Sequence, residues 1–321
     1  MYEIEIRKKS KDFDGGGIVE EKADRDVRPK RSQRRRTFLK TTFGFLVVIT
    51  VSTLLSTVMM HATNDVPFSE TLLGLAFGTK EAGDRSRCPP GMSFVSSSDG
   101  SFCIDTYTAS AGKNCPNQDP SSRSETGENI LTSGCVPVSE PNALPWRYIS
   151  QTQAQEACQK AGKFLPNGRQ WFYASRGTPS EVPLSSDSCN LSNNWAYSPG
   201  PVGSGEDCVS YAGVYDQVGN VWEWVNDTAR DGVIDGHTLP DPGYITSVDA
   251  TSLVLATDPD RPDENYTNDR FWMSPEGTRG VMRGGFYGSG TDGGVYSMHV
   301  EMTPDFAGRA LGFRCATEPL R

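Results

Sequence analysis

Two acidic residues, Asp216 and Glu223, flank a glycine-containing bend. Between them, Gly219 and Val221 can offer backbone carbonyl oxygens. Carboxylates and carbonyl oxygens on a curved loop are the ligands that a hard cation such as Ca²⁺ prefers. The spacing alone nevertheless favours an arrangement without metal, in which Asp216 caps a helix and Glu223 forms a surface salt bridge.

A second group of titratable residues, Asp292, His299 and Glu301, lies within a short stretch near the C-terminus. His299 could act as a general base that a neighbouring carboxylate orients. A surface-exposed histidine without a catalytic role is the commoner outcome for such a pattern. The chain has no Gly-x-Ser-x-Gly elbow, phosphate-binding loop or dinucleotide fingerprint. These three residues are therefore catalytic candidates without an assigned reaction.

All eight cysteines follow residue 87. Their even number and the absence of a Cys-x-x-Cys pair predict disulfides of an exported domain, not zinc or thioredoxin-like sites. Eight cysteines allow about 105 pairings. Local spacing suggests three short bridges and leaves one long one: Cys88–Cys103, Cys115–Cys135, Cys189–Cys208 and Cys158–Cys315.

Regular elements must position these residues, and the clearest ones precede residue 178. A hairpin is expected over residues 88–110, followed by a polar loop over 111–145. Apolar spacing predicts a short helix over 151–161, and Asn167 with Gln170 forms the capping box of a second one.

Few periodic stretches occur between residues 178 and 280, so loops should dominate there. The acidic, proline-rich insertion at 258–270 lacks the regular aspartate spacing of a calcium loop and is predicted to be solvated. Short strands are expected at residues 221–225, 281–285 and 311–316.

The residues up to position 60 are predicted to contain an export and anchoring segment. Residues 41–60 carry no charge and are long enough, as a helix, to cross a bilayer. The basic flank before them predicts a cytoplasmic N-terminus and an exported body. Residues 35–40, Arg-Arg-Thr-Phe-Leu-Lys, look like a twin-arginine signal, and a generic signal-anchor is the alternative. Residues 60–62 form a poor cleavage site, which favours retention as an anchor.

These signals divide the chain into four parts. They predict a protein of the bacterial inner membrane with its body in the periplasm or outside the cell, or a periplasmic or secreted protein if the signal is cleaved. The parts are a disordered basic cytoplasmic tail (1–37), a twin-arginine-type signal or transmembrane anchor (38–60), a linker (61–87) and a folded domain (88–321).

Charge is distributed unevenly along the chain. Residues 1–40 carry a net charge of +5, which leaves −14 for the remainder of a chain whose total is −9. An acidic body argues against a phosphate-binding surface, so no nucleic-acid partner is expected.

Three segments together resemble the sulfatase-modifying-factor, or formylglycine-generating enzyme, family. They are GKFLPN from residue 162, GVYDQVGNVWEW from residue 213, and RGG from residue 283 with LGFRC from residue 311. They occur in the family's order, so the resemblance covers nearly all of residues 88–316. It implies an α+β, C-type-lectin-like fold, rich in loops, with a small antiparallel sheet and two helices.

The resemblance also bears on the metal and the disulfides. The family binds a structural calcium through the positions of Asp216, Gly219, Val221 and Glu223, which reverses the preference that spacing gave. A weaker second calcium site would involve Asn190 and Leu191. Cys158–Cys315 matches a disulfide position of the family. Trp222 and Trp224 are expected in core and loop packing.

The family's oxidase reaction needs two cysteine thiolates, between the RGG and LGFRC segments, that bind copper and activate oxygen. Here no cysteine occurs between residues 208 and 315. Other side chains of this interval cannot replace thiolates as copper ligands. No copper is therefore expected, and the family's oxidation is excluded unless another protein supplies the sulfurs.

The leading hypothesis is a catalytically silent, exported and membrane-tethered family member. It would bind a peptide, glycan or envelope protein through a cleft beside residues 286–302, with residues 41–60 in the membrane. One alternative is an enzyme of the same family that modifies another protein or cofactor, with Asp292 or His299 in its reaction. A second alternative is a structural subunit of an envelope complex.

Overall fold

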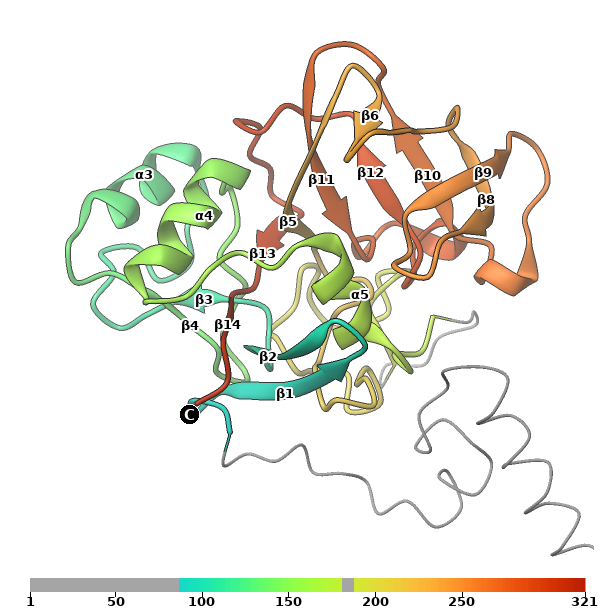
Figure 1. The fold of residues 1–321 in the computed structure, drawn as a ribbon. Helices are drawn as coiled ribbons and strands as arrows, with labels where there is room; N and C mark the ends of the chain where they lie inside the picture. Colours follow the sequence, from blue (N-terminus) through green and yellow to red (C-terminus); the bar gives the residue numbers. More distant parts are fainter. Residues whose placement is uncertain (1–86, 181–187, 321) are drawn as a thin grey trace, which may run out of the picture. The chain divides into compact units, whose positions relative to one another are not determined.

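The computed structural model describes residues 87–180 and 188–320, which belong to one compact unit, Thr79–Arg321. The predicted tail and anchor, and all but the last residue of the linker, lie outside the described residues. The described part is a loop-rich α+β domain with few helices and a curled sheet, which fits a C-type-lectin-like fold (Figure 1). None of its helices is long and apolar enough to cross a membrane.

Each of the three described α-helices starts at a capping side chain. They are α3 (Arg123–Leu131), α4 (Gln151–Lys160) and α5 (Gly168–Ser175). Ser150 with Gln153, and Asn167 with Gln170, form complete capping boxes, so the two predicted helices are confirmed. The expectation of a loop throughout 111–145 is wrong, because α3 begins there after Ser122, whose side chain accepts from Glu125 N.

Two small sheets flank the helices. The predicted hairpin is present as β1 (Met92–Ser97) and β2 (Gly100–Asp105), and β14 (Ala316–Thr317) adds a third strand to it. Strand β3 (Ser110–Ala111) pairs with β4 (Pro137–Val138). In Figure 1 the β1–β2 hairpin lies below α5, near the C-terminus.

The main sheet has nine strands, in the order β7-β6-β5-β11-β12-β10-β8-β9, with β13 also paired to β5. Its strands are β5 (Trp222–Arg230), β6 (Val233–Ile234), β7 (His237–Thr238), β8 (Gly243–Val248), β9 (Val254–Asp258), β10 (Arg270–Met273), β11 (Thr278–Arg283), β12 (Met298–Val300) and β13 (Leu311–Phe313). Two 3-10 turns, η2 (Glu264–Tyr266) and η3 (Gly290–Asp292), interrupt its loops.

This sheet differs from the small antiparallel one that was expected. It includes two parallel pairs, β10 with β12 and β13 with β5. The expected strand at 221–225 is present within β5. Strands β6 to β10 also fall within the stretch 178–280, where loops were expected to dominate. These strands are short and irregular in register, so period-two alternation over a few residues gave too weak a signal.

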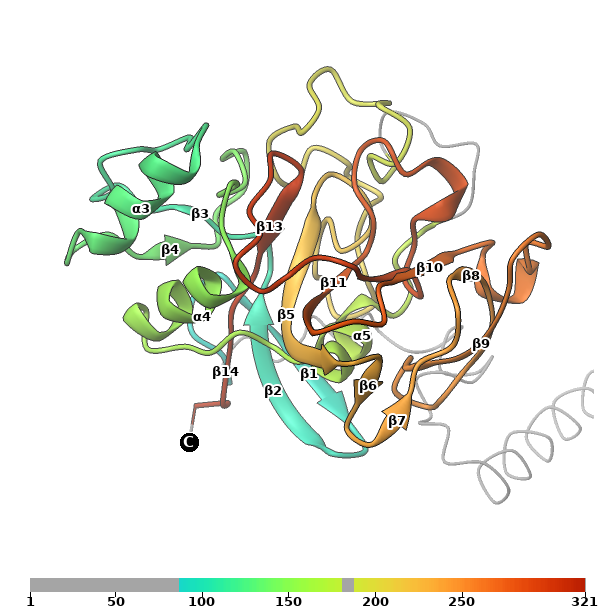
Figure 2. The ribbon, with the colours of Figure 1, turned by 90° about the horizontal axis from the view of Figure 1, so that it is seen from above.

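Strand pleating separates two hydrophobic cores. Trp222 and Trp224 of β5 enter one buried cluster, together with Met282 of β11. Val225 and Ala229 enter the other one. Alternate side chains of one strand point to opposite faces, so strands β5 and β11 form the wall between both cores. Figure 2 shows these two strands between α4 on one side and β8 with β9 on the other.

Four disulfides close the domain, and their pairs are those expected from the sequence: Cys88–Cys103, Cys115–Cys135, Cys158–Cys315 and Cys189–Cys208. The four cysteines of the bridges Cys158–Cys315 and Cys189–Cys208 are fully buried. The bridge from Cys158 in α4 to Cys315 spans 157 residues and ties the helical side to the end of the chain.

Candidate functional site

Glu223 lies at the centre of a buried ion pair with Arg314, in which both side chains are at most 1% exposed. Arg314 Nε donates to Oε2 at 2.7 Å and Nη2 donates to Oε1 at 2.7 Å. Trp171 Nε1 also donates to Oε2, and Thr108 Oγ1 donates to Oε1. Both carboxylate oxygens are therefore fully engaged, and Glu223 is not the surface residue of the metal-free alternative.

The three sequence motifs converge on this ion pair. Arg314 donates to the carbonyl oxygens of Asp105 and Tyr215. Asp105 in turn accepts from Lys163 Nζ at 2.6 Å and from the backbone N–H of Cys315. The motif residues thus form one buried polar network, which joins segments far apart in the chain.

Two motif glycines allow the same segments to approach closely. Gly219 has φ +76° and a Cβ there would lie 2.3 Å from Asn190 O. Gly284 has φ +92° and a Cβ there would lie 2.2 Å from Gln217 O. Gly219 N donates to Gly284 O at 2.9 Å, so the second and third motifs are joined at their backbones.

The four residues of the expected calcium site fit an ion only in part. Asp216 is 1% exposed, its Oδ2 accepts from Gly203 N, and its Oδ1 is buried without a partner. Burial raises the pKa of the Asp216 carboxyl to about 7. An orphaned carboxylate oxygen suits a cation. Glu223, in contrast, has no free lone pair, because Arg314, Trp171 and Thr108 together make two hydrogen bonds to each of its oxygens. Gly219 and Val221 lie on the loop between these two carboxylates.

The expected second calcium site involves two fully buried residues. Asn190 Oδ1 has no hydrogen-bond partner, while its backbone oxygen accepts from Asn220 N at 2.8 Å. Leu191 O accepts from Gly290 N at 2.8 Å. The structure therefore places Asn190 beside the glycine-containing bend. The Leu191 carbonyl oxygen is already engaged in a backbone hydrogen bond.

Trp222, Trp272 and His299 contact one another on one face of the main sheet. Together with Phe286 and Met302, which pack against the same core, they are called the aromatic patch here. Trp272 meets Trp222 edge-on at 5.7 Å between ring centroids and stacks on His299, also at 5.7 Å. Trp272, Phe286 and Met302 pack against the first core but remain partly exposed. The patch offers aromatic and aliphatic surface next to a titratable pair.

His299 and Glu301 form that pair, as a general base and its orienting carboxylate would. His299 Nε2 lies 3.1 Å from Glu301 Oε2, and the side chains are 14% and 40% exposed. His299 Nδ1 accepts from Glu301 N, which fixes the neutral tautomer with the proton on Nε2. Among the described residues, no hydrogen bond or ion pair joins Asp292 of η3 to His299 or to Glu301. Burial raises the pKa of the Asp292 carboxyl. The structure brings together two of the three candidates.

The buried imidazole makes a prediction about acid stability. Burial lowers the pKa of His299 from 6.5 to about 4, so the unfolded chain takes up a proton first as the pH falls. Stability from this group is complete above pH 6.5 and is lost progressively down to pH 4, by up to about 3 kcal/mol. His299→Gln should flatten this pH dependence in denaturant unfolding. An identical slope in both proteins would contradict the assignment.

Two residues of these sites were not found from the sequence. Trp272 follows the acidic insertion and lies in the short strand β10. In that strand Phe271 and Met273 are buried and alternate with Trp272, and this alternation was the only local signal of a strand. Arg314 was seen as a motif residue, but its pairing with Glu223 spans 91 residues. Such contacts follow from tertiary topology and leave no local signal.

Comparison with known proteins gives one family. A profile described as "Sulfatase-modifying factor enzyme 1-like domain" matches residues 100–319. A search of curated proteins gives no match.

Solved structures match at low similarity. The Major Tropism Determinant U1 variant is 17% identical over 73% of this chain and 54% of that one, with a TM-score of 0.39. PvdO from Pseudomonas aeruginosa is 16% identical over 68% of this chain and 81% of its own, at 0.34. Treponema denticola variable protein 1 is 14% identical over 72% and 100%, at 0.35. The chain spans about half the length of the Major Tropism Determinant. These TM-scores are too low to support a conclusion about the function of this chain.

Proposed function

Because the chain belongs to the family of sulfatase-modifying factor enzyme 1-like domains, we propose that it is a non-oxidase member of that family. Its body binds a peptide, glycan or protein partner in the bacterial envelope. It keeps the family's framework and uses it for recognition.

The observation that carries this proposal is the state of the cysteines. The chain has eight, and all eight are paired in four disulfides. The reaction of the formylglycine-generating enzymes uses two thiolates as soft copper ligands. A cysteine in a disulfide cannot supply a thiolate, so this chain has no free thiol with which to perform that step.

The aromatic patch supports recognition as the remaining role. Partly exposed aromatic side chains supply large contact area at low entropic cost and are enriched where proteins bind partners. Glu301, with 40% of its side chain exposed, adds a hydrogen-bond acceptor at the edge of the patch. Residues 286–302, which were expected to line the binding cleft, contribute Phe286, His299 and Met302 to it.

Affinity capture from a membrane extract tests this proposal. The full chain, extracted with detergent, should retain a partner in stoichiometric amount, and Trp272→Ala should lose it. Tyr211→Ala is the matched control, because Tyr211 is an aromatic residue outside the patch and 71% exposed. Equal capture by both variants would refute a role for the patch.

The His299–Glu301 pair favours one alternative, an enzyme that modifies another protein or cofactor. A neutral histidine beside a carboxylate is a common general base, but here Nδ1 accepts from Glu301 N, so this hydrogen bond has to open before His299 can accept a proton from a substrate. In that case His299→Gln would fold normally and abolish turnover without loss of partner capture. Under the recognition proposal, the same variant weakens capture and no turnover exists to be lost.

Export and tethering are part of the proposal and rest on residues 35–60 alone. Arg35→Lys with Arg36→Lys should block export of the folded body if the signal is of the twin-arginine type. Fractionation of cells that produce each form measures this. Unchanged export would favour a generic signal-anchor. Recovery of the wild type in the membrane fraction, and not in the soluble periplasmic one, would indicate an uncleaved anchor.

We also propose a structural calcium ion at Asp216. Ca²⁺ in excess should raise the melting temperature of the full chain by roughly 5 °C over the chelated protein, since 100-fold excess over Kd contributes about 2.7 kcal/mol. The effect should be larger at pH 8 than at pH 5, because burial holds the Asp216 pKa at about 7.

The matched variants decide whether Asp216 is responsible. Asp216→Asn should abolish the calcium-dependent shift, and Asp207→Asn, which changes an exposed carboxylate in the preceding loop, should keep it. A shift of equal size in all three proteins, or no shift in the wild type, would exclude calcium at this position.

A further inference from the structure

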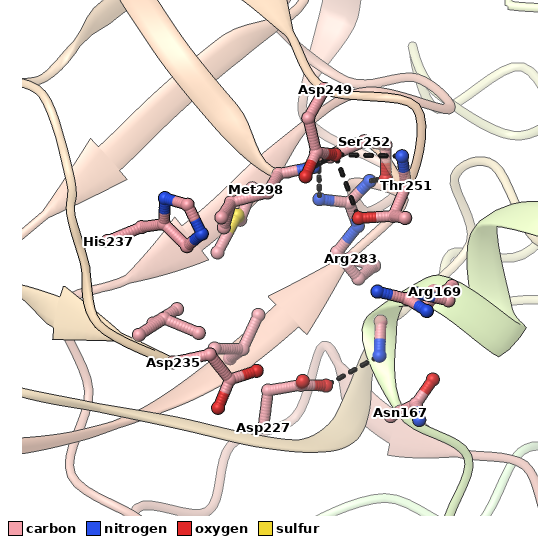
Figure 3. A pocket seen from close by; sticks show the side chains of 14 residues that line it. Asn167, Arg169, Asp227, Asp235, His237, Asp249, Thr251, Ser252, Arg283 and Met298 are labelled. Carbon is pink, nitrogen blue, oxygen red and sulfur yellow. Dashed lines mark hydrogen bonds between the residues drawn. The ribbon is translucent and has the colours of Figure 1, made fainter.

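A polar cavity of about 190 Å³ lies away from the aromatic patch (Figure 3). Its walls come from the start of α5, from β5 to β7, from the loop between β8 and β9, and from β11 and β12. Its charged lining residues are Arg169, Asp227, Asp235, Asp249 and Arg283, with His237 at the opening.

Strand alternation places this cavity on the opposite face of the main sheet from the aromatic patch. In β12, Met298 lines the cavity, whereas its neighbour His299 belongs to the patch. In β11, Arg283 lines the cavity and Met282 enters the first core, which supports the patch. The two sites are therefore separate, and an inference about the cavity does not rest on the proposed function.

Arg283 is a buried cation without an ion pair among the described residues. Its side chain is 2% exposed. The guanidinium donates to Ser252 Oγ at 2.7 Å and to the carbonyl oxygens of Ser252 and Val295, all of them neutral acceptors. It also lies over the Trp171 ring at 5.5 Å.

One donor of this guanidinium, Nε, has no partner at all. Burial lowers the pKa of Arg283 to about 10, which leaves it charged at neutral pH. A buried charge is costly unless an opposite charge lies within reach. The carboxylates of Asp227, Asp269 and Asp249 act on Arg283 without forming an ion pair with it among the described residues. An anionic group in the cavity would therefore supply the missing acceptor for Nε.

The acidic lining residues are Asp249, which lies beside Ser252, and the pair Asp227 and Asp235. Asp227 is partly buried, and its Oδ2 accepts from Gly168 N. Burial raises the pKa of Asp227, and the neighbouring carboxylate of Asp235 raises it further. Figure 3 shows these two side chains next to each other, with Arg283 across the cavity. A cation between them would relieve their repulsion.

We propose that this cavity binds a small zwitterion of the free α-amino acid class, with its carboxylate at Arg283 and its ammonium group at Asp227 and Asp235. The volume suits this class, because cavities for drug-sized ligands are about 300–1,000 Å³ and this one is about 190 Å³. The apolar residues Ile234, Val281 and Met298 leave a non-polar part for a side chain.

Ligand-observed NMR titration of the detergent-solubilised full chain tests the proposal. The probes are the common free L-amino acids, with acetate and methylamine as single-charge halves. At least one amino acid should bind with a Kd below about 10 mM, and at least tenfold more tightly than either half. Asp235→Asn should weaken this binding about fivefold or more, and Asp241→Asn should leave it unchanged.

The variants are chosen so that folding does not obscure the result. Asp235 and Asp241 are both exposed aspartates, and only Asp235 lines the cavity. Arg283→Lys is expected to weaken binding more than Asp235→Asn, but a loss of folding in that variant would not affect the conclusion. Any of three results overturns the proposal: no amino acid binds, acetate or methylamine binds as tightly, or Asp235→Asn binds like the wild type.

Discussion

Replacement of Arg314 by methionine should lower the free energy of unfolding by about 3–5 kcal/mol, because it leaves Glu223 as an unpaired buried charge. Glu223 would retain only the neutral donors Trp171 Nε1 and Thr108 Oγ1. The carbonyl oxygens of Asp105 and Tyr215 would lose their donors as well. Guanidinium unfolding followed by tryptophan fluorescence measures the change.

Two further variants separate the charge effect from the loss of a large side chain. Arg314→Met combined with Glu223→Gln should be more stable than Arg314→Met alone, since no uncompensated charge remains. Arg169→Met breaks the exposed pair with Asp99, whose side chains are 51% and 46% exposed, and should cost at most about 1 kcal/mol. If Arg314→Met and Arg169→Met cost the same, the buried ion pair does not hold the motifs together.

Removal of the long disulfide should have an effect of similar size. Cys158→Ala with Cys315→Ala opens a loop of 157 residues, and the chain-entropy model gives about 5 kcal/mol for such a closure. Both cysteines are fully buried, so the loss of their packing adds to the loss of stability. Non-reducing unfolding experiments on the full chain measure the difference.

The matched control is the pair Cys115→Ala with Cys135→Ala. This bridge closes only 20 residues and should contribute about 3 kcal/mol in the same model. The loop-length account therefore predicts the larger loss for Cys158–Cys315. A larger loss for the shorter bridge would show that local packing, and not restriction of the unfolded chain, decides the order.

Local signals predicted helices α4 and α5 and the first hairpin. The capping pair Asn167 and Gln170 and the turn before Gly100 act over three or four residues, so the sequence contains the whole interaction. Strand β10 was missed because its partner β12 is distant in sequence, as Met298 is from Phe271. Strands β8 and β9 pair with each other, but register shifts break the regular alternation that would have revealed them. Helix α3 was missed although Ser122 and Glu125 gave a capping signal, because the segment around it is polar.

The site could be predicted only as a set of positions. Motif resemblance indicated Asp216 and Glu223, and both are buried at the junction of the motifs. It did not reveal that Glu223 pairs with Arg314, because a carboxylate beside a metal and one beside a guanidinium require the same local sequence. The partners of His299 could not be predicted for the same reason: Trp222 and Trp272 approach it from other strands.

The motif residues therefore hold the framework. Lys163, Glu223 and Arg314 make buried hydrogen-bonded contacts across distant segments, and Gly219 and Gly284 allow those segments to meet. These contacts are independent of the thiolates that the oxidase reaction needs. A chain can thus keep the family's fold without its chemistry, which is the basis of the proposed function.

The central claim is most directly tested by incubating the full chain, under non-reducing conditions, with copper, oxygen and a sulfatase-type cysteine peptide, and following the peptide by mass spectrometry. We predict that the cysteine stays unconverted, while a family member with its thiol pair, run in parallel, converts it to formylglycine. Catalytic conversion by this chain would contradict the account.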